Sequence, residues 1–141
     1  LRKAWAAARL AGGAGEAAPR AIELVPGVLR LRYAENTGAA FSMFSDRGWP
    51  LIAVTALALA LIAFWLIAKR PGGLADWGLA LVLAGGLSNL YDRIAYGYVV
   101  DFIEPTFVRF AVFNLADTWV CVGAALTLIG LWMKERRRKT P

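Results

Sequence analysis

The sequence contains no histidine and a single cysteine, Cys121. Without histidine, neither Ser-His-Asp nor Cys-His catalysis is available, and one thiol offers no set of soft ligands for a structural zinc ion. A single cysteine also excludes a disulfide within the chain. Any catalytic chemistry must therefore come from the carboxylates, cations and amides, and we expect no metal or other cofactor.

Charged residues are scarce, at 18% of the chain, whereas 59% of the residues are hydrophobic. This apolar share exceeds that of an ordinary soluble domain. The apolar residues gather in three blocks, about 51–68, 74–90 and 117–133, each long enough to cross a bilayer as a helix. The sequence therefore predicts a multi-pass membrane protein that forms a single domain.

The positions of the cations predict the topology. The net charge is +6, but the cations cluster beside the apolar blocks without an aromatic–basic stripe, so nucleic-acid binding is not expected. Lys69-Arg70 and the basic tail 134–141 belong on the cytoplasmic side, where cations near membrane ends prefer to lie. Three crossings then place residues 1–48 and 91–116 together on the outer face.

The predicted outer segments carry strand patterns. Residues 29–33 alternate strictly between apolar and polar, which is the period of a half-buried strand, and Asn36–Gly38 follows as a turn signal. Residues 98–103 and 107–113 are rich in β-branched and aromatic side chains and are predicted to be short strands. We expect a small sheet beside the outer membrane surface.

Polar residues next to apolar sequence are the candidates for chemistry, because an ionisable group at membrane depth is costly. Asp101 lies within 99–103, and Asp117 opens the third block. Two carboxylates in one weakly solvated site share a proton, so one can take a proton from water while the other protonates a scissile carbonyl. The remaining candidates at the outer ends of the blocks are Asn89, Asp92, Arg93 and Asn114.

Each candidate also has a structural interpretation. Asn114 can be the N-cap of the third helix, with Asp117 in its first turn, and Asp101 can be a solvated residue between two strands. Asp92-Arg93 can be an ion pair beside the membrane, and Gly85-Gly86 can be a close contact between helices. The spacing of the carboxylates alone does not decide between these interpretations.

Three strings together resemble lipoprotein signal peptidase, also called signal peptidase II. They are Glu35-Asn36-Thr37-Gly38-Ala39-Ala40-Phe41-Ser42, then Gly85 to Arg93 continuing to Gly97 to Phe102, and Phe113-Asn114-Leu115-Ala116-Asp117. They occur in the family's order and spacing, and the likeness extends from about Pro26 to the basic tail. The resemblance implies a membrane all-α bundle with a small extracytoplasmic β-cradle, located in the bacterial inner membrane.

The resemblance also implies an activity and a site. Such an enzyme is an aspartyl endopeptidase that cleaves a prolipoprotein just before its diacylglyceryl-modified cysteine, and Asp101 and Asp117 would be the catalytic pair. Membrane lipid would surround it, cyclic peptides of the globomycin type would inhibit it, and a monomer is expected. The polar residues that would orient the pair and hold the substrate are Asn36, Asn89, Asp92, Arg93 and Asn114.

One departure from the family concerns the start of the sequence. The family has four transmembrane helices, of which the first ends in an Asp-x-x-Ser/Thr-Lys pattern. Lys3 would match the lysine, whereas Arg2 replaces the hydroxyl residue. We therefore expect three of the helices here, with the first one missing from this sequence.

Two other functions remain open at this point. A non-catalytic membrane assembly or channel subunit would use the same carboxylates for helix capping or proton conduction. A prepilin-type aspartyl peptidase would act on the cytoplasmic side, which the predicted topology opposes.

Overall fold

The computed structural model describes residues 21–38, 48–69 and 72–139. The chain forms two compact units, one from residues 1–48 and 92–115 and the other from residues 49–91 and 116–141. The expectations that concern Leu1–Lys3, the apolar stretch 39–44 and the cation Arg70 lie outside the described residues.

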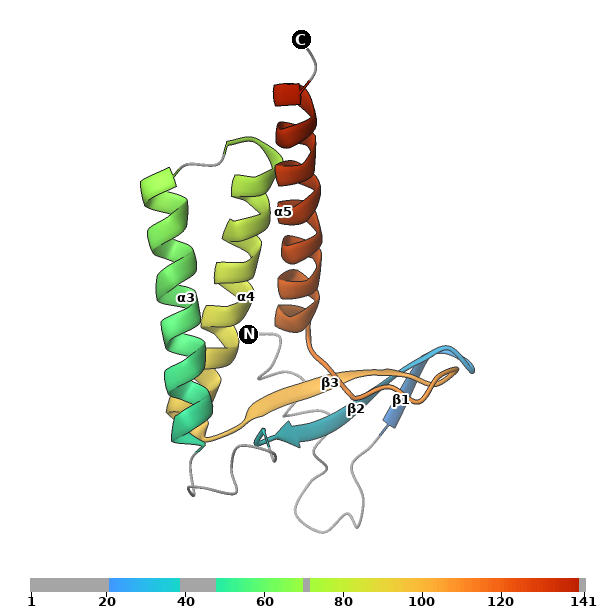
Figure 1. Ribbon diagram of the computed structural model, residues 1–141. Coiled ribbons are helices and arrows are strands. Elements are labelled where there is room, and N and C mark those ends of the chain that lie inside the picture. Colours follow the sequence, from blue (N-terminus) through green and yellow to red (C-terminus); the bar gives the residue numbers. More distant parts are fainter. Residues whose placement is uncertain (1–20, 39–47, 70–71, 140–141) are drawn as a thin grey trace. The chain divides into compact units, whose positions relative to one another are not determined.

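The first unit contains a three-stranded antiparallel sheet (Figure 1). Its strands are β1 (Ala21–Val25), β2 (Leu29–Asn36) and β3 (Val99–Pro105), in the order β1-β2-β3. A tight turn joins β1 to β2, because Gly27 has a φ of 70° and the Val28 N–H donates to the Val25 carbonyl at 3.0 Å. Glycine adopts this left-handed conformation without steric cost.

The register of β2 against β3 gives the sheet two distinct ends. Asn36 pairs with Val99 at one end, and Arg30 pairs with Glu104 near the other. The register shifts between Leu31 and Ala34, where β2 has one residue more than β3. Such a bulge changes which side chains of β2 point to each face.

Two of the three predicted strands are confirmed and one is wrong. The strands expected at 29–33 and 98–103 are confirmed by β2 and β3, and β1 was not anticipated. The strand expected at 107–113 is wrong, since within that range only Phe113 pairs with β3, through a bridge to Ile103. Pro105 ends β3, and proline has no N–H to extend a ladder.

The sheet has a small apolar core around Phe102, which is 7% exposed. The side chains packed against it are Leu31, Tyr33, Val100, Ile103 and Leu115. They come from β2, from β3 and from Leu115 at the start of α5 (Leu115–Lys139), so Phe102 joins the parts of the chain on which the candidate site depends.

The second unit is built from helices that lie side by side (Figure 1). They are α3 (Trp49–Lys69), α4 (Leu74–Tyr96, whose last turn belongs to the first unit) and α5 (Leu115–Lys139). Among the described residues, α3 and α5 are long and apolar enough to cross a membrane. The expected third crossing, by α4, is not confirmed, because α4 is not among the helices that meet this measure of length and apolarity.

Helix α4 is also longer than expected. It continues to Tyr96 instead of stopping at Leu90, so Asp92 and Arg93 are helical and not part of a loop. Gly97 ends it with a φ of 82°, and its N–H donates to the Arg93 carbonyl at 3.0 Å, as in a glycine C-cap.

Glycines bring the helices of the second unit into close contact. A Cβ atom on Gly123 of α5 would lie 2.5 Å from the carbonyl oxygen of Gly78 on α4, and one on Gly86 would lie 2.5 Å from the side chain of Leu59 on α3. No Cβ atom fits at such distances without a shift of its neighbour. The predicted close helix contact at Gly85-Gly86 is confirmed, and it follows the small-residue packing of membrane helices.

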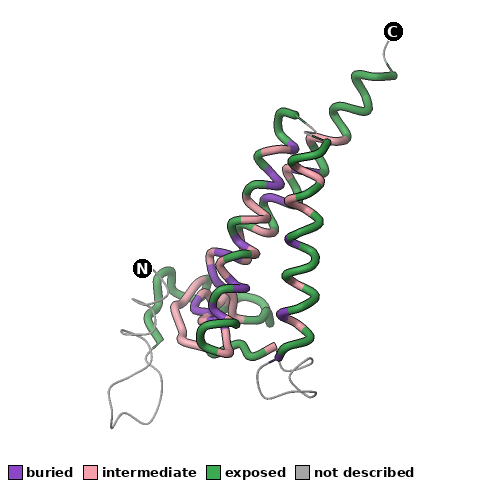
Figure 2. Tube along the Cα trace, turned by 90° about the vertical axis from the view of Figure 1, so that its left-hand side faces the viewer, coloured by how far each residue is buried: buried purple, intermediate pink, exposed green. Residues whose placement is uncertain are grey.

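Large apolar side chains cover the outside of these helices, which Figure 2 colours mostly as exposed. Leu57, Phe64 and Ile67 of α3 are 62%, 69% and 72% exposed. A surface of this kind is costly in water and suits lipid. The helices therefore have the exterior of a membrane protein.

Candidate active site

Asp101 lies on β3, an outer strand of the first unit's sheet, and is 2% exposed. It pairs with Ala34 of β2, and Asn36 lies two residues further along that strand, on the same face. The Asn36 Nδ2 atom donates to Asp101 Oδ2 at 2.9 Å. The Gly38 N–H donates to Asn36 Oδ1 at 2.9 Å, which fixes the amide so that its nitrogen faces Asp101.

Asn114 approaches Asp101 from the segment that returns after β3. The Phe113 carbonyl accepts hydrogen bonds from the N–H groups of Phe102 and Ile103 at 3.0 and 2.8 Å, which holds this segment against the strand. The Asn114 Nδ2 atom then donates to Asp101 Oδ1 at 2.7 Å, and its side chain is fully buried.

Asp101 therefore accepts an amide hydrogen bond on each of its two oxygens. These two hydrogen bonds hold the carboxylate in one orientation. A buried carboxylate fixed in this way is suited to accept a proton from a water molecule placed beside it.

Asp117 has a similar partner within the second unit. It lies in the first turn of α5, and Asn89 Nδ2 of α4 donates to its Oδ1 at 2.6 Å. Gly85 lies one turn before Asn89 and contacts the carbonyl oxygen of Ala116, where a Cβ atom would not fit. The glycine therefore allows α4 to come close enough to α5 for Asn89 to reach Asp117.

Comparison with known proteins agrees with these features. The sequence matches the family model described as signal peptidase (SPase) II over residues 1–133. The chain belongs to the signal peptidase II family. It is therefore a peptidase, and the apolar helices agree with a membrane location.

Individual relatives of this signal peptidase II family member are also similar over most of their length. The lipoprotein signal peptidase of Streptococcus pyogenes serotype M6 is 38% identical over 138 residues, which are 96% of this chain and 86% of the relative. The corresponding protein of serotype M3 is 37% identical over the same shares.

Two solved structures of bacterial membrane enzymes, determined by the in meso method, have related folds. One, at 2.3 Å resolution, is 27% identical with a TM-score of 0.75 and covers 86% of this chain and 76% of its own. The other, at 1.9 Å, is 24% identical with a TM-score of 0.75, covers 92% of this chain and 88% of its own, and shares the fold.

The residues predicted to form the peptidase's site divide between the two units. Asn36, Asp101 and Asn114 come together in the first unit, and Asn89 and Asp117 come together in the second. The meeting of the two carboxylates, which neither unit contains by itself, stays a prediction.

Asp92 and Arg93 lie in the last turns of α4, beyond Asn89. Asp92 is buried and Arg93 is half-buried. Their positions three and four residues after Asn89 put them on the same side of the helix. Their roles in binding, and the ion pair between them, stay predictions.

The helix-cap interpretation of Asn114 and Asp117 is correct about position. Asn114 immediately precedes α5, and Asp117 lies in its first turn. Because the Asn114 amide also donates to Asp101, the two interpretations do not exclude each other. One residue starts the helix and holds a candidate catalytic carboxylate.

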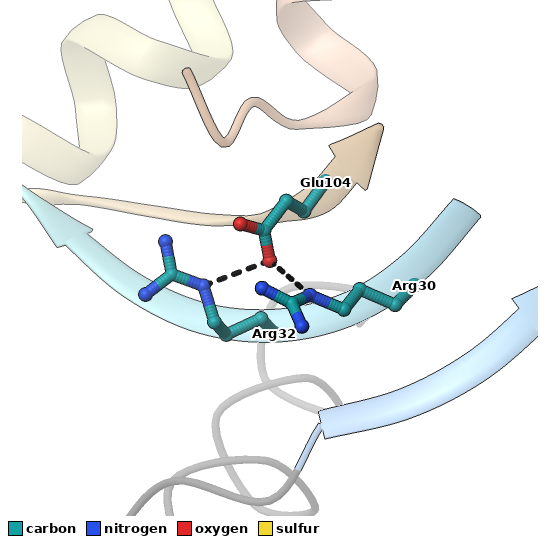
Figure 3. Close-up of polar contacts among 3 residues, drawn as sticks. All are labelled: Arg30, Arg32 and Glu104. Carbon is teal, nitrogen blue, oxygen red and sulfur yellow. Dashed lines mark hydrogen bonds and ion pairs between the residues drawn. The ribbon is translucent and has the colours of Figure 1, made fainter. Parts of the chain in front are cut away.

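A cluster that the sequence did not reveal lies at the other end of the sheet (Figure 3). The Nε atoms of Arg30 and Arg32 donate to the same oxygen of Glu104, at 2.6 and 2.9 Å. The hydrogen bond from Arg30 holds the pKa of Glu104 below its ordinary value. The alternation of arginines in 29–33 was a signal for the strand, but nothing in the sequence identified their partner.

Proposed function

We propose that this signal peptidase II family member is an aspartyl endopeptidase that removes the signal peptide from lipid-modified prolipoproteins. The cut would fall just before the diacylglyceryl-cysteine, on the outer side of the bacterial inner membrane. The observation that carries the proposal is Asp101, a buried carboxylate with an amide hydrogen bond on each oxygen. Family membership supplies the substrate class.

In the proposed reaction Asp101 acts as the general base. It takes a proton from water, and the resulting hydroxide attacks the scissile carbonyl carbon while the proton on Asp117 moves to the carbonyl oxygen. The tetrahedral intermediate then collapses: the proton that Asp101 took from water passes to the leaving amine as the C–N bond breaks, and a hydroxyl proton of the intermediate returns to Asp117. The assignment of the base rests on geometry, since the amides of Asn36 and Asn114 donate to both oxygens of Asp101 and hold it in one orientation.

The remaining polar residues are proposed to serve the substrate and the pair. The amide of Asn89 holds Asp117, while Asp92 and Arg93 would hold the backbone of the precursor. Cyclic peptides of the globomycin type would compete for the same place. We also propose that α4 crosses the membrane in this protein, since it packs through glycines against α3 and α5, both long enough to do so.

The test is a precursor-cleavage assay on the full chain in membranes. Asp101→Asn and Asp117→Asn should each reduce cleavage of a diacylglyceryl-modified prolipoprotein by at least roughly 10³-fold, the scale of general acid–base catalysis, while thermal unfolding stays cooperative. Asp76→Asn is the matched control. Asp76 lies in the first turn of α4 and accepts the Gly72 N–H at 3.0 Å, so its substitution should leave cleavage unchanged.

Two outcomes would contradict the proposal. Substantial cleavage by Asp101→Asn or by Asp117→Asn would contradict the assignment of these two residues as the catalytic pair. Full stability and altered ion flux, without accumulation of precursors, would instead favour the channel or assembly function.

A further inference from the structure

The end of the sheet furthest from Asp101 carries an open depression of about 390 Å³ within the first unit. It lies between the start of β2, the end of β3 and the residues that follow β3. Its walls are formed by Arg30, Glu104, Pro105, Thr106, Val108, Arg109 and Phe110. The proposed catalytic reaction uses none of these side chains.

The charges around this depression are organised by Glu104. Its side chain is 15% exposed, whereas those of Arg30 and Arg32 are 37% and 41% exposed. The carboxylate is therefore covered and the guanidinium groups are more accessible. A guanidinium has five N–H donors in a rigid plane, and Glu104 engages each arginine through Nε alone. Figure 3 shows the terminal nitrogens of Arg32 directed away from Glu104.

Arg109 adds an exposed cation to the same depression. Among the described residues, the acidic groups that face the cluster are Glu104 and Glu23, which pairs with Arg30 from β1. In the described part of the first unit, three arginines therefore accompany two carboxylates here. An anion that binds two guanidinium groups at once, as a phosphate does, would complete the pairing.

Apolar side chains surround the cations. Phe107, Val108 and Phe110 are 71%, 48% and 63% exposed, and Val28 is 46% exposed. A hydrogen bond of 2.9 Å from the Thr106 N–H to the Val28 carbonyl joins the turn after β1 to this segment. We call Val28, Arg30, Phe107, Val108, Arg109 and Phe110 the distal surface. Exposed aromatic residues interleaved with arginine are typical of a protein face at the membrane–water interface.

The chain itself keeps the distal surface near a bilayer. Phe110 precedes Leu115, the first residue of α5, by five residues, and α5 is long and apolar enough to cross a membrane. Five extended residues reach at most about 18 Å. Whatever the orientation of the sheet, Phe110 therefore remains within reach of lipid headgroups if α5 crosses the bilayer.

From these observations we propose that the distal surface is a docking site for anionic phospholipid, with a headgroup phosphate held by Arg30 and Arg109 and with Phe107 and Phe110 entering the interface. Glu104 is a positioning residue for Arg30. The docking anchors the sheet to the membrane surface at the end opposite Asp101. It does not depend on the catalytic proposal, since it involves different residues and can be measured without substrate.

The experiment places a fluorescent reporter on the distal surface of the full chain. Cys121 is replaced by serine, Phe107→Cys is labelled with an environment-sensitive dye, and the protein is placed in nanodiscs of phosphatidylcholine with or without phosphatidylglycerol. Spin-labelled lipids quench a dye that enters the interface. We expect quenching to increase with phosphatidylglycerol.

The arginine variants provide the decisive comparison. Arg109→Gln should lower the ratio of inserted to free reporter roughly fivefold in the anionic nanodiscs, the effect of one cation at such a surface, and Arg30→Gln should act in the same direction. Lys139→Gln, at the far end of α5, is the matched control and should have no effect. Arg109→Lys keeps the charge and should restore most of the quenching.

Several results would overturn the proposal. Quenching that is absent, or that does not change with lipid charge, would exclude anionic lipid as the occupant. Reversal of quenching by inorganic phosphate at constant ionic strength would identify a free-phosphate site instead. Energy transfer between differently labelled copies in one nanodisc, abolished by Phe110→Ser, would identify a contact between two copies of this chain. Asp101→Asn, in contrast, should leave the quenching unchanged, so failure of the catalytic proposal would be recognised separately.

Discussion

Asp101 and Glu104 lie three residues apart on β3 but have different kinds of partner. Asp101 is 2% exposed and accepts hydrogen bonds from the neutral amides of Asn36 and Asn114. Glu104 is partly exposed and accepts hydrogen bonds from two guanidinium groups. Because neighbouring side chains alternate on a strand, the two carboxylates point to opposite faces of the sheet.

The comparison shows how one strand can carry two carboxylates with different tasks. Direct pairing with two cations strongly favours the charged form, so Glu104 serves structure and orients the arginines. Amides orient a carboxylate without adding a positive charge, so Asp101 can be held in place and still exchange a proton. We therefore expect substitutions around Asp101 to change precursor cleavage, and substitution of Glu104 to change mainly the stability of the protein.

The largest expected effect is on stability and comes from Phe102, the core residue between Asp101 and Glu104 on β3. Phe102→Ala should destabilise the sheet by about 3–5 kcal/mol, as loss of a buried aromatic side chain does. Hydrogen exchange of the β2 and β3 amides should accelerate at both ends, and precursor cleavage should fall with it. Phe102→Leu is the milder control. Acceleration confined to one end would mean that the ends are energetically independent.

The next largest effect is expected at Asn114. Asn114→Ala removes a fully buried donor and leaves Asp101 Oδ1 without its amide, so precursor cleavage should fall roughly 100-fold, on the scale of one hydrogen bond to a buried charge. The measurement is kcat/KM together with thermal unfolding. Loss of activity without a matching loss of stability would support a role at Asp101, whereas parallel losses would indicate only a helix cap.

The Asn114→Asp variant sharpens this test. A protonated carboxylic acid at position 114 can donate to Asp101, whereas the ionised form cannot donate and repels it. Cleavage should therefore recover in part as the pH is lowered, relative to the native protein measured at the same pH. A variant whose relative activity does not change with pH would contradict the donor role.

A smaller effect is expected at Asn36, because this residue is exposed. Water can replace its amide at Asp101, so Asn36→Ala should lower precursor cleavage by only about tenfold. The ratio between the effects at Asn114 and Asn36 measures how far burial controls each hydrogen bond. Equal losses of cleavage in Asn114→Ala and Asn36→Ala would contradict this, because they would mean that water does not replace the Asn36 amide at Asp101.

The extent to which the sequence foretold this arrangement depended on the range of the interactions. Local patterns predicted α3 and the alternating strand β2, since apolar length and period-two alternation are properties of neighbouring residues. The strings that contain Asn36 and Asn114, through their resemblance to signal peptidase II, led to the residues that hold Asp101. The end of α4 was misplaced because Asp92 and Arg93 resemble a membrane boundary in sequence, although the helix continues to Tyr96.

Interactions between distant residues could not be predicted in the same way. Arg30 and Glu104 are 74 positions apart, and their contact depends on the register of β2 against β3, which the bulge alters. The segment 107–113 has the composition of a strand, but only Phe113 pairs with the sheet, through Ile103, and the aromatic residues Phe107 and Phe110 are exposed. The composition of a segment does not reveal whether a neighbouring strand is available to pair with it.

The smallest effect is expected at Glu104. Glu104→Gln removes the charge from a partly exposed pair, so the melting temperature at pH 7 should fall by only roughly 1–4 °C, and precursor cleavage in detergent should be unchanged. Added salt should reduce the difference between the variant and the native protein, because it screens exposed charges. A large loss of activity would contradict the division of tasks between the two ends of the sheet.

The pH dependence of this small effect has a definite sign. The pKa of Glu104 is lowered in the folded protein from its ordinary value of 4.5, first by the hydrogen bond from Arg30. A lowered folded pKa means that the stabilisation is present above pH 4.5 and is lost as the pH falls below that value towards the folded pKa. The difference in melting temperature between the native protein and Glu104→Gln should therefore shrink on acidification below pH 4.5. A difference that grows there instead would show that Glu104 is not held in its charged form by the arginines.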